Sequence, residues 1–525
     1  MTEPVGVGAN ARAIAVITAV SRVAGLARTL VFAWCVGTTA VGTAYQSANT
    51  VPNVVFEVAA GGVLAAAAVP LLAARVERGD RAGASQVASA LLTWVLAALV
   101  PLALLVALAA PALAALLLDG AETQRLATRM LWVFAPQVVL YGIGIVGTGI
   151  LHSHGRFIAA ALAPLVSSVV VIVTYLAYAA MTGDAALWVL AGGTTAGVAA
   201  LVVTLLPSLR HTGLRLRPTF SFPPGVAARA RRLAGAGLVA LLAQQANVLA
   251  VLWLTNHRGG QGAINGYQYV QAIYLLPYAV LAVPLATAAY PVLAAAEGAG
   301  PEAAGTLARS LHTIALLTGA AGATLIGAAP DLGRFFGALD AGRDGVGGEA
   351  LAALPDALTA FAPGLVGFGL AALLTRALYV RGRARLASLV MAGGWLVAAV
   401  LPWVATAGRV EVLLTLRMLG VGSSVGMTLA GAGLLILVRR SWGPAAVAGV
   451  VPAVGAALVA LVAGSVVARL ADGWLPEPSG VAGAVARGIV CGVIAVAVFA
   501  AVVAVLRPDA ARALRRGRGR PGGAG

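Results

Sequence analysis

The sequence predicts an all-α polytopic membrane protein with about fourteen transmembrane helices, in two pseudo-symmetric six-helix lobes plus two extra C-terminal helices. The first observation is composition: the 525 residues are 60% hydrophobic and 10% charged, with a mean hydropathy of +0.95. The second is that apolar runs of about twenty residues recur along the chain, long enough to cross roughly 30 Å of hydrocarbon. These runs must be helical, because in lipid each backbone polar group has to be satisfied within its own segment. The third is an internal sequence repeat.

Each long apolar run is expected to form one membrane-spanning helix, with boundaries placed to within about four residues. The first run is too long for a cleavable signal and no basic segment precedes it, so it is interpreted as the first span. Cys35 and Cys491 lie in apolar runs and are expected to be small hydrophobic fillers rather than a disulfide. The expected spans are residues 12–37, 43–74, 86–118, 126–151, 157–181, 186–206, 230–255, 265–296, 306–329, 357–380, 385–406, 411–438, 444–468 and 481–506.

The distribution of charge orients these helices. With the N-terminus inside, 23 of the 35 arginines fall in cytoplasmic segments, seven fall outside and five lie within helices. Because arginine-rich loops stay in the cytoplasm, both termini are predicted to be cytoplasmic. The net charge of +17 follows from this asymmetry. The basic tail 507–525 is interpreted as a disordered stretch on anionic lipid, and no nucleic-acid partner is expected.

Two pairs of similar stretches indicate an internal duplication. FAPQVVLYGIGIVGTGILHSHGR (134–156) aligns without a gap with FAPGLVGFGLAALLTRALYVRGR (361–383), and AVPLLAA (68–74) aligns with AYPVLAA (289–295). Six is an even number of helices, so both copies enter the membrane in the same sense. The predicted division is an N-terminal lobe at 1–210, a C-terminal lobe at 211–440, two added helices at 441–506 and a cytoplasmic tail at 507–525. Such lobes are typical of a rocker transporter with a site near the midplane; a duplicated scaffold without moving parts is the alternative.

Two arginines in the middle of the first span indicate a functional site. Arg22 and Arg28 lie roughly 15 and 24 Å from the inner end of that helix, where an ionised side chain costs on the order of 3 kcal/mol. Their spacing separates them by about 120° around the helix and roughly 9 Å along it, with Gly25 leaving room between them. One interpretation is a cationic site for an anionic substrate, because the guanidinium fork suits phosphate oxygens. The other is an Arg22–Glu57 pair that holds a helical hairpin, with Arg28 facing a water-filled vestibule.

The remaining arginines within spans are Arg376, Arg417 and Arg487, which lie nearer the helix ends and are expected to snorkel to the headgroups. In the second lobe, uncharged polar side chains take the place of the central arginines. They are expected either to border a cavity and bind sugar or amide groups, or to pair across helices. These residues are Gln244, Gln245, Asn247 and Gln271.

No enzymatic machinery is apparent in the sequence. His152 and His154 are spaced i, i+2 and do not share a helix face, so metal binding is not expected there. There is no nucleotide-binding loop and no nucleophile–base pair. The sequence therefore predicts neither an enzyme nor a cofactor.

Several stretches carry a family resemblance: SRVAGLAR (21–28), NTVPN (49–53), GILHSHGRFIAAALAPLVSSVVVIV (149–173), RALYVRGRARLA (376–387) and GAGLLILVRR (431–440). On these stretches the chain resembles the MurJ (MviN) family of lipid II flippases, within the superfamily of multidrug, oligosaccharidyl-lipid and polysaccharide exporters. The resemblance implies fourteen helices and a groove for a lipid tail on the last two. It also implies translocation of an undecaprenyl-pyrophosphate-linked peptidoglycan precursor, with Arg22 and Arg28 among the arginines that hold the pyrophosphate.

The chain departs from the family pattern in two of its helices. Phe56 and Glu57 stand where relatives typically carry a basic pair, and Thr43 stands at an acidic position. In the eighth helix Ala272, beside Gln271, replaces an arginine. The cationic site that the resemblance implies is therefore reduced to the two arginines of the first helix.

The leading hypothesis is a lipid II flippase of the bacterial cytoplasmic membrane that works by alternating access. Its expected partners are a lipid-linked anionic substrate, membrane lipids, a coupling ion or the membrane potential, and cell-wall synthesis proteins. The alternatives are a flippase for another polyprenyl-linked glycan, an exporter of small amphipathic molecules, and a non-transporting scaffold for cell-wall assembly. The candidate substrate-binding residues are Arg22, Gly25, Arg28, Asn53, Glu57, Gln244, Gln245, Asn247 and Gln271.

Overall fold

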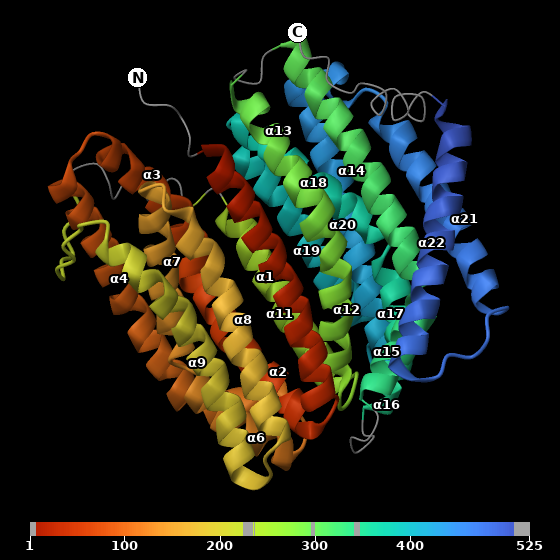
Figure 1. The fold of residues 1–525 in the computed structure, drawn as a ribbon, viewed down its shortest axis with the longest axis horizontal. Helices are drawn as coiled ribbons and strands as arrows, with labels where there is room; N and C mark the ends of the chain where they lie inside the picture. Colours follow the sequence, from red (N-terminus) through yellow and green to blue (C-terminus); the bar gives the residue numbers. More distant parts are fainter. Residues whose placement is uncertain (1–6, 224–234, 236, 296–299, 341–346, 509–525) are drawn as a thin grey trace. The chain divides into compact units, whose positions relative to one another are not determined.

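The computed structural model describes the chain except residues 1–6, 224–234, 236, 296–299, 341–346 and 509–525, and leaves the side chains of 7–15, 60–68 and 70 undescribed. The described residues are helical, with short connections and no strand among them (Figure 1). The start of the span expected at 230–255 and most of the basic tail lie outside the described residues. The chain divides into two compact units, Met1–Asn265 with Gly342–Gly347, and Gly266–Ala341 with Gly348–Gly525.

The first unit holds the helices up to the end of α11. Asn256, near the end of α11, donates its side-chain amide to Ser47 Oγ and to the carbonyl of Leu117, both at 2.9 Å. These bonds attach α11 to the helices before it. Its helices are α1 (Val7–Cys35), α2 (Ala40–Phe56), η1 (Glu57–Gly61), α3 (Gly62–Glu77), α4 (Arg81–Leu108), α5 (Ala110–Leu117), α6 (Ala121–Phe134), α7 (Gln137–Ser153), α8 (Phe157–Ala179), α9 (Gly183–Arg210) and α11 (Leu238–His257).

The second unit contains the remaining helices, and α21 packs against α22 and α14 within it. Its helices are α12 (Ala263–Pro277), whose first turn belongs to the first unit, η2 (Tyr278–Ala282), α13 (Val283–Ala295), α14 (Pro301–Gly327), α15 (Ala329–Leu339), α16 (Gly348–Ala352), α17 (Leu354–Phe361), α18 (Gly364–Val380), α19 (Ala384–Ala405), α20 (Val412–Trp442), η3 (Pro444–Val447), α21 (Val450–Asp472) and α22 (Gly480–Leu506).

The predicted class, a polytopic all-helical membrane protein, is confirmed, whereas the count of fourteen spans is not. Among the described residues, twelve helices are long and apolar enough to cross a membrane, or thirteen if α17 and α18, bent by 43°, form one span. The span expected at 43–74 is helical from Ala40 to Glu77 but is interrupted by η1, and it is not among the twelve.

Capping side chains fix where helices begin. Asp80 precedes α4 and accepts the N–H of Gly83 at 2.8 Å, a bond that satisfies one of the free donors at a helix start. Arg75 donates to the same carboxylate at 3.0 Å. The Gly83 N–H and the Arg75 guanidinium hold the pKa of the Asp80 carboxyl below its usual value. The connection between α3 and α4 is therefore held by its own side chains.

The two copies of the Phe-Ala-Pro repeat fold alike. Phe134 and Phe361 each end a helix, and Pro136 and Pro363 each precede a helix of 17 residues. Proline lacks the N–H that would continue the preceding helix, which explains a break at the same place in both copies. Twenty-one residues after each phenylalanine, Gly155 and Gly382 take positive φ angles of 70° and 67°, so the turn after the helix is also repeated.

Apolar side chains form a core in each unit. In the first unit, buried residues of α4, including Leu91, Val95 and Leu99, pack on Phe56 and on α7. Gly142 of α7 lies so close to Leu99 and Val95 that an added Cβ would clash with both. In the second unit the core is built around α14, α18 and α20, with Trp442 at one end donating Nε1–H to the carbonyl of Ala377 at 3.1 Å.

Arg487 does not snorkel to a headgroup, and this expectation is wrong. Its side chain is buried, and its Nε donates to Asp472 Oδ1 at 2.8 Å and lies 3.3 Å from Asp331 Oδ1. The connection after α21 folds back, so Arg487 Nη1 also donates to the carbonyl of Pro476 at 2.6 Å. Arg334 donates to Asp331 at 2.8 Å. The cluster therefore contains two arginines and two aspartates. This Asp–Arg cluster ties α15, α21 and α22 together.

Replacing Arg487 with alanine is expected to destabilise the second unit strongly. Asp331 and Asp472 would lose one of the two arginines that compensate their charge. Breaking a buried ion pair on one side typically costs about 3–5 kcal/mol. The thermal unfolding midpoint of the purified protein in detergent should fall clearly for Arg487→Ala. The control Arg409→Ala removes an exposed arginine from the same unit and should leave the midpoint unchanged. Equal midpoints for the two variants would contradict a stabilising role for the cluster.

Candidate functional site

Helix α1 carries two exposed arginines within an otherwise apolar stretch. Arg22 and Arg28 are both exposed, as are the neighbouring side chains of Val20 and Val23. The helix packs against α8, and Ser21 Oγ donates to the carbonyl of Ala161 at 3.2 Å. One side of α1 is thus fixed to the first unit, and the arginines lie on the surface that this packing leaves open.

The Arg22–Glu57 pair that was the structural alternative is not formed. Among the described residues, no carboxylate lies within ion-pair distance of Arg22 or Arg28. Glu57 is half-buried at the first position of η1, without an ion-pair partner among the described residues. The two guanidinium groups are therefore unneutralised by protein carboxylates in the described part of the chain.

The space beside Gly25 is open. A Cβ placed on Gly25 would meet no heavy atom within 4 Å, unlike the tightly packed Gly42, where it would clash with the carbonyl of Gly37. The glycine lies three residues from each arginine, so the gap is on the helix segment that joins them. The structure thus leaves open space at Gly25, between the two arginines along the helix.

Behind α1, Tyr45 of α2 packs on Phe32 of α1, with ring centroids 5.2 Å apart. Tyr45 is buried, and its hydroxyl lies 2.9 Å from that of Tyr175 and 3.0 Å from Thr194 Oγ1. Tyr45 therefore links α2 to α8 and α9 behind the arginine helix. Sequence reasoning missed this cluster.

A signal for it was present in the four-residue spacing of Tyr45, Asn49, Asn53 and Glu57, which places one polar stripe along a helix. Asn53 donates its side-chain amide to the carbonyl of Asn49 at 2.7 Å. The Oδ1 atom of Asn49 is buried without a hydrogen-bond partner among the described residues. The Asn49 side-chain oxygen can therefore still accept a hydrogen bond inside the first unit.

Glu57 opens a π-helical turn that recurs in the second copy of the repeat. The turn η1 begins at Glu57 and η2 begins at Tyr278, each is five residues long, and their offset is that of the AVPLLAA and AYPVLAA stretches. π-Turns inside α-helices are rare and often lie at functional sites. The first copy presents a carboxylate there and the second a tyrosine, stacked on Phe368 with ring centroids 4.1 Å apart.

The uncharged polar candidates fall in different units. Gln245 and Asn247 are buried in the first unit on α11, while Gln244 is exposed on the same helix. Gln271 lies in the second unit and donates its side-chain amide to the hydroxyl of Tyr267 at 2.9 Å. The structure thus places Gln244 and Gln271 where a solute or a neighbouring side chain could reach them, and buries the other two.

The positions at which the chain departs from the family pattern have structural roles here. Thr43 Oγ1 accepts the N–H of Gly262 at 3.1 Å, next to a bond from Asn265 to the carbonyl of Gly37 at 2.9 Å. Phe56 is buried against Tyr141, with ring centroids 5.4 Å apart. Both side chains contribute to packing within the first unit.

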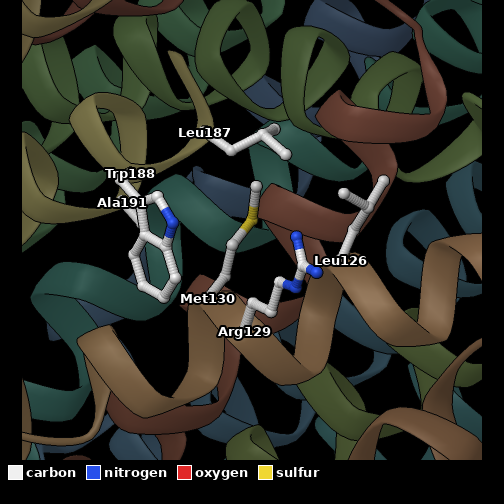
Figure 2. Close-up of a pocket in the computed structure, with 6 residues that line it drawn as sticks. All are labelled: Leu126, Arg129, Met130, Leu187, Trp188 and Ala191. Carbon is white, nitrogen blue, oxygen red and sulfur yellow. The ribbon is translucent and has the colours of Figure 1, made fainter. Parts of the chain in front are cut away.

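Two other features of the described residues do not provide a site. The cavity in Figure 2, between α6 and α9, has a volume of about 10 Å³, room for about one water molecule. Asp331, Asp472 and Cys491 have potential ligand atoms within 4.8 Å of one another. Their carboxylates already bind Arg334 and Arg487, whose positive charge disfavours a metal ion in the same place.

Comparison with known proteins places the chain in a family. The sequence profile described as "Lipid II flippase MurJ" matches residues 32–500. The chain is 29% identical over 356 residues to a probable lipid II flippase MurJ of Rhizobium tropici, covering 65% of the chain and 66% of that protein. It is 31% identical over 228 residues to a probable lipid II flippase MurJ of Synechocystis, covering 41% and 42%. The aligned parts thus span less than two thirds of each relative's length.

Solved structures share the fold. The structure described as "Lipid II flippase MurJ, inward closed conformation" matches with a TM-score of 0.73 at 16% identity, covering 94% of this chain and 98% of that one. An inward-facing multidrug transporter of the MATE family matches with a TM-score of 0.65 at 17% identity, covering 81% and 95%. Because the family profile matches most of the chain, the protein belongs to the lipid II flippase MurJ family.

Proposed function

We propose that the protein is a lipid II flippase, which moves an undecaprenyl-pyrophosphate-linked peptidoglycan precursor from the inner to the outer leaflet by alternating access. The single observation that carries the proposal is the pair Arg22 and Arg28, exposed on an apolar helix without carboxylate partners among the described residues. Each ionised side chain at bilayer depth costs on the order of 3 kcal/mol, so an uncompensated pair implies a function. Membership of the family supplies the class of cargo.

The chemistry of the pair suits a pyrophosphate. Guanidinium groups bind phosphate oxygens through two parallel hydrogen bonds, and they stay protonated at any physiological pH. A separation of roughly 9 Å along the helix lets two long side chains converge on one extended anion. In the proposal Gly25 gives the cargo close access to α1. Asn53 and Glu57, which belong to the polar stripe that begins at Tyr45, contribute polar contacts to the cargo. Of the uncharged polar candidates, Gln244 and Gln271 contribute contacts to sugar or peptide groups, whereas Gln245 and Asn247 are buried in this structure.

The proposal also assigns an orientation in the membrane and a role to each segment of the chain. Both termini lie in the cytoplasm of a bacterium, since arginine-rich segments stay inside. In the proposal the predicted lobes, 1–210 and 211–440, alternate, and residues 211–265 move with the first lobe because they belong to its compact unit. Helices α21 and α22 within 441–506 hold the lipid tail. Each charge moved through 100 mV is worth about 2.3 kcal/mol, so the membrane potential or an ion gradient can drive the cycle.

Removing both arginines is expected to abolish transport. Hydrogen bonds to charged groups contribute about 1.5–3 kcal/mol each, so the double variant Arg22→Ala/Arg28→Ala should lose at least tenfold in rate. The measurement is outer-leaflet lipid II in cells depleted of their own flippase and supplied with this chain. Arg417→Ala, which removes an exposed arginine from α20, should retain wild-type transport. Full transport by the double variant would refute the site, and failure of the wild-type chain at normal membrane levels would refute the cargo.

A bulky side chain at Gly25 is expected to block the cargo without affecting the fold. A Cβ at this position meets no heavy atom within 4 Å, so we expect Gly25→Leu to keep the wild-type unfolding temperature while transport falls several-fold. Gly192→Leu is the matched control, because Gly192 of α9 has the same open surroundings. If both variants transport as the wild type does, the space beside Gly25 is not used by cargo.

The MATE-type fold match supports a second candidate, an exporter of small amphipathic molecules. It predicts drug or dye efflux that does not depend on polyprenyl carriers and that persists when lipid II synthesis is blocked. A non-transporting scaffold would restore growth of flippase-depleted cells only beside another active flippase. The outer-leaflet assay separates the three outcomes.

A further inference from the structure

The segment after α9 forms an extended strap along α4, within the first unit. Residues 213–223 adopt no helix and lie beside α4, as the yellow-green trace in Figure 1 shows. Three of its N–H groups donate to hydroxyl oxygens spaced four residues apart on α4. The pairs are Arg215 with Ser85 (3.2 Å), Arg217 with Ser89 (3.0 Å) and Thr219 with Thr93 (3.0 Å).

Every second N–H group of the strap meets every fourth side chain of α4, because the two spacings are nearly equal. Four helical residues rise about 6 Å, and two extended residues rise about 6.6 Å, so the bonds stay aligned over three repeats. Trp94 closes the strap by donating Nε1–H to the carbonyl of Phe220 at 3.1 Å. Its ring packs edge-to-face on Phe220 with centroids 5.1 Å apart. The strap is therefore a fixed part of the first unit.

A groove of about 340 Å³ lies between the strap and α4. Its walls are mainly apolar, with Leu92, Leu96 and Ala97 on the helix and Leu216, Pro218 and Phe220 on the strap. Leu216 and Phe220 are 45% and 58% exposed. Beyond the groove, the exposed face of α4 continues with Val100, Leu104 and Leu108, so the groove opens onto an apolar surface.

Cations lie beside this apolar groove. Arg217 lines the groove together with Leu216 and Pro218. Side chains alternate along an extended chain, so Arg215, two residues before Arg217, shares its side of the strap. Both arginines are exposed, and neither forms an ion pair with a described residue. An exposed pair of cations next to an apolar groove complements a molecule with an anionic head and an apolar tail.

The depth of the groove matches the edge of a bilayer. From Arg81 at the start of α4, Ser85 and Ser89 lie about 6 and 12 Å along the helix axis. Arg75, Arg78 and Arg81 cluster at this end, which the proposed orientation puts in the cytoplasm. From these levels a long arginine side chain reaches the headgroup layer, while the groove extends toward the bilayer centre.

We propose that this groove binds an anionic glycerophospholipid of the cytoplasmic leaflet. Arg215 and Arg217 hold the phosphate, and one acyl chain lies in the groove against Leu92, Leu96 and Phe220. The proposal rests on the orientation given above and not on the flippase activity. The bound lipid would add to the hydrogen bonds that hold residues 213–223 against α4.

The test uses the full-length protein in phosphatidylcholine nanodiscs with a trace of phosphatidylglycerol carrying a photoactivatable group on one acyl chain. After illumination, labelled peptides are identified by mass spectrometry. Phosphatidylglycerol should label 86–97 and 214–222 several-fold more than a phosphatidylcholine with the same photoactivatable chain. Arg215→Gln/Arg217→Gln should remove this preference, and Arg439→Gln/Arg440→Gln, an exposed pair at the end of α20, should retain it. Ala97→Trp, which fills the groove and keeps both arginines, should reduce labelling by either lipid.

Equal labelling by the two lipids, or a preference unchanged in Arg215→Gln/Arg217→Gln, would overturn the proposal. The proposal would also be overturned if undecaprenyl diphosphate, added in a smaller amount than phosphatidylglycerol, abolished labelling by phosphatidylglycerol. The groove would then belong to the cargo path. The unfolding temperature of each variant is measured in parallel, and only variants with a wild-type midpoint are compared. Outer-leaflet lipid II reports the flippase proposal separately, so failure of one proposal leaves the other standing.

Discussion

The high cost of placing charge in hydrocarbon accounts for the most informative contrast in this protein. Arg487 is buried and neutralised by Asp472 and Asp331, so its charge serves to join three helices. Arg22 and Arg28 belong to the same residue type and also lie within a span, yet no described carboxylate lies within ion-pair distance of either. In the second unit the cost of the charge on Arg487 is offset by paired carboxylates. In the first unit Arg22 and Arg28 have no such partners and are exposed instead. Only the exposed pair remains available to an external anion.

Satisfaction of backbone polar groups is the second constraint, and it explains the irregular segments. The π-turns η1 and η2 interrupt α-helical bonding at equivalent places in the two copies of the repeat. The residue at the start of the turn differs, Glu57 in one copy and Tyr278 in the other. The backbone N–H groups of the strap, which has no helical hydrogen bonds of its own, donate instead to hydroxyl groups of α4.

Phe56 and Glu57, where the family resemblance implies a basic pair, have different surroundings in the first unit. Phe56 extends the apolar core toward Tyr141, and Glu57 places an acid at the π-turn. The positive charge of the proposed cargo site is therefore concentrated on α1, at Arg22 and Arg28. In the proposed function, amide side chains supplement a smaller number of cations in holding the cargo.

The sequence alone determined the helical membrane class, the Phe-Ala-Pro repeat and the two central arginines, because hydropathy, identity at a fixed offset and charge within an apolar run are local properties. It did not determine that Arg487 pairs with Asp472 and Asp331, because those residues approach through a fold-back after α21 that leaves no periodic signal. Nor did it reveal the strap, whose bonds join residues more than 120 positions apart. The open surface beside Gly25 and the absence of an Arg22–Glu57 pair likewise depend on how α1 packs against α8. Tertiary packing decides these features, because it selects which of several possible partners each polar group meets.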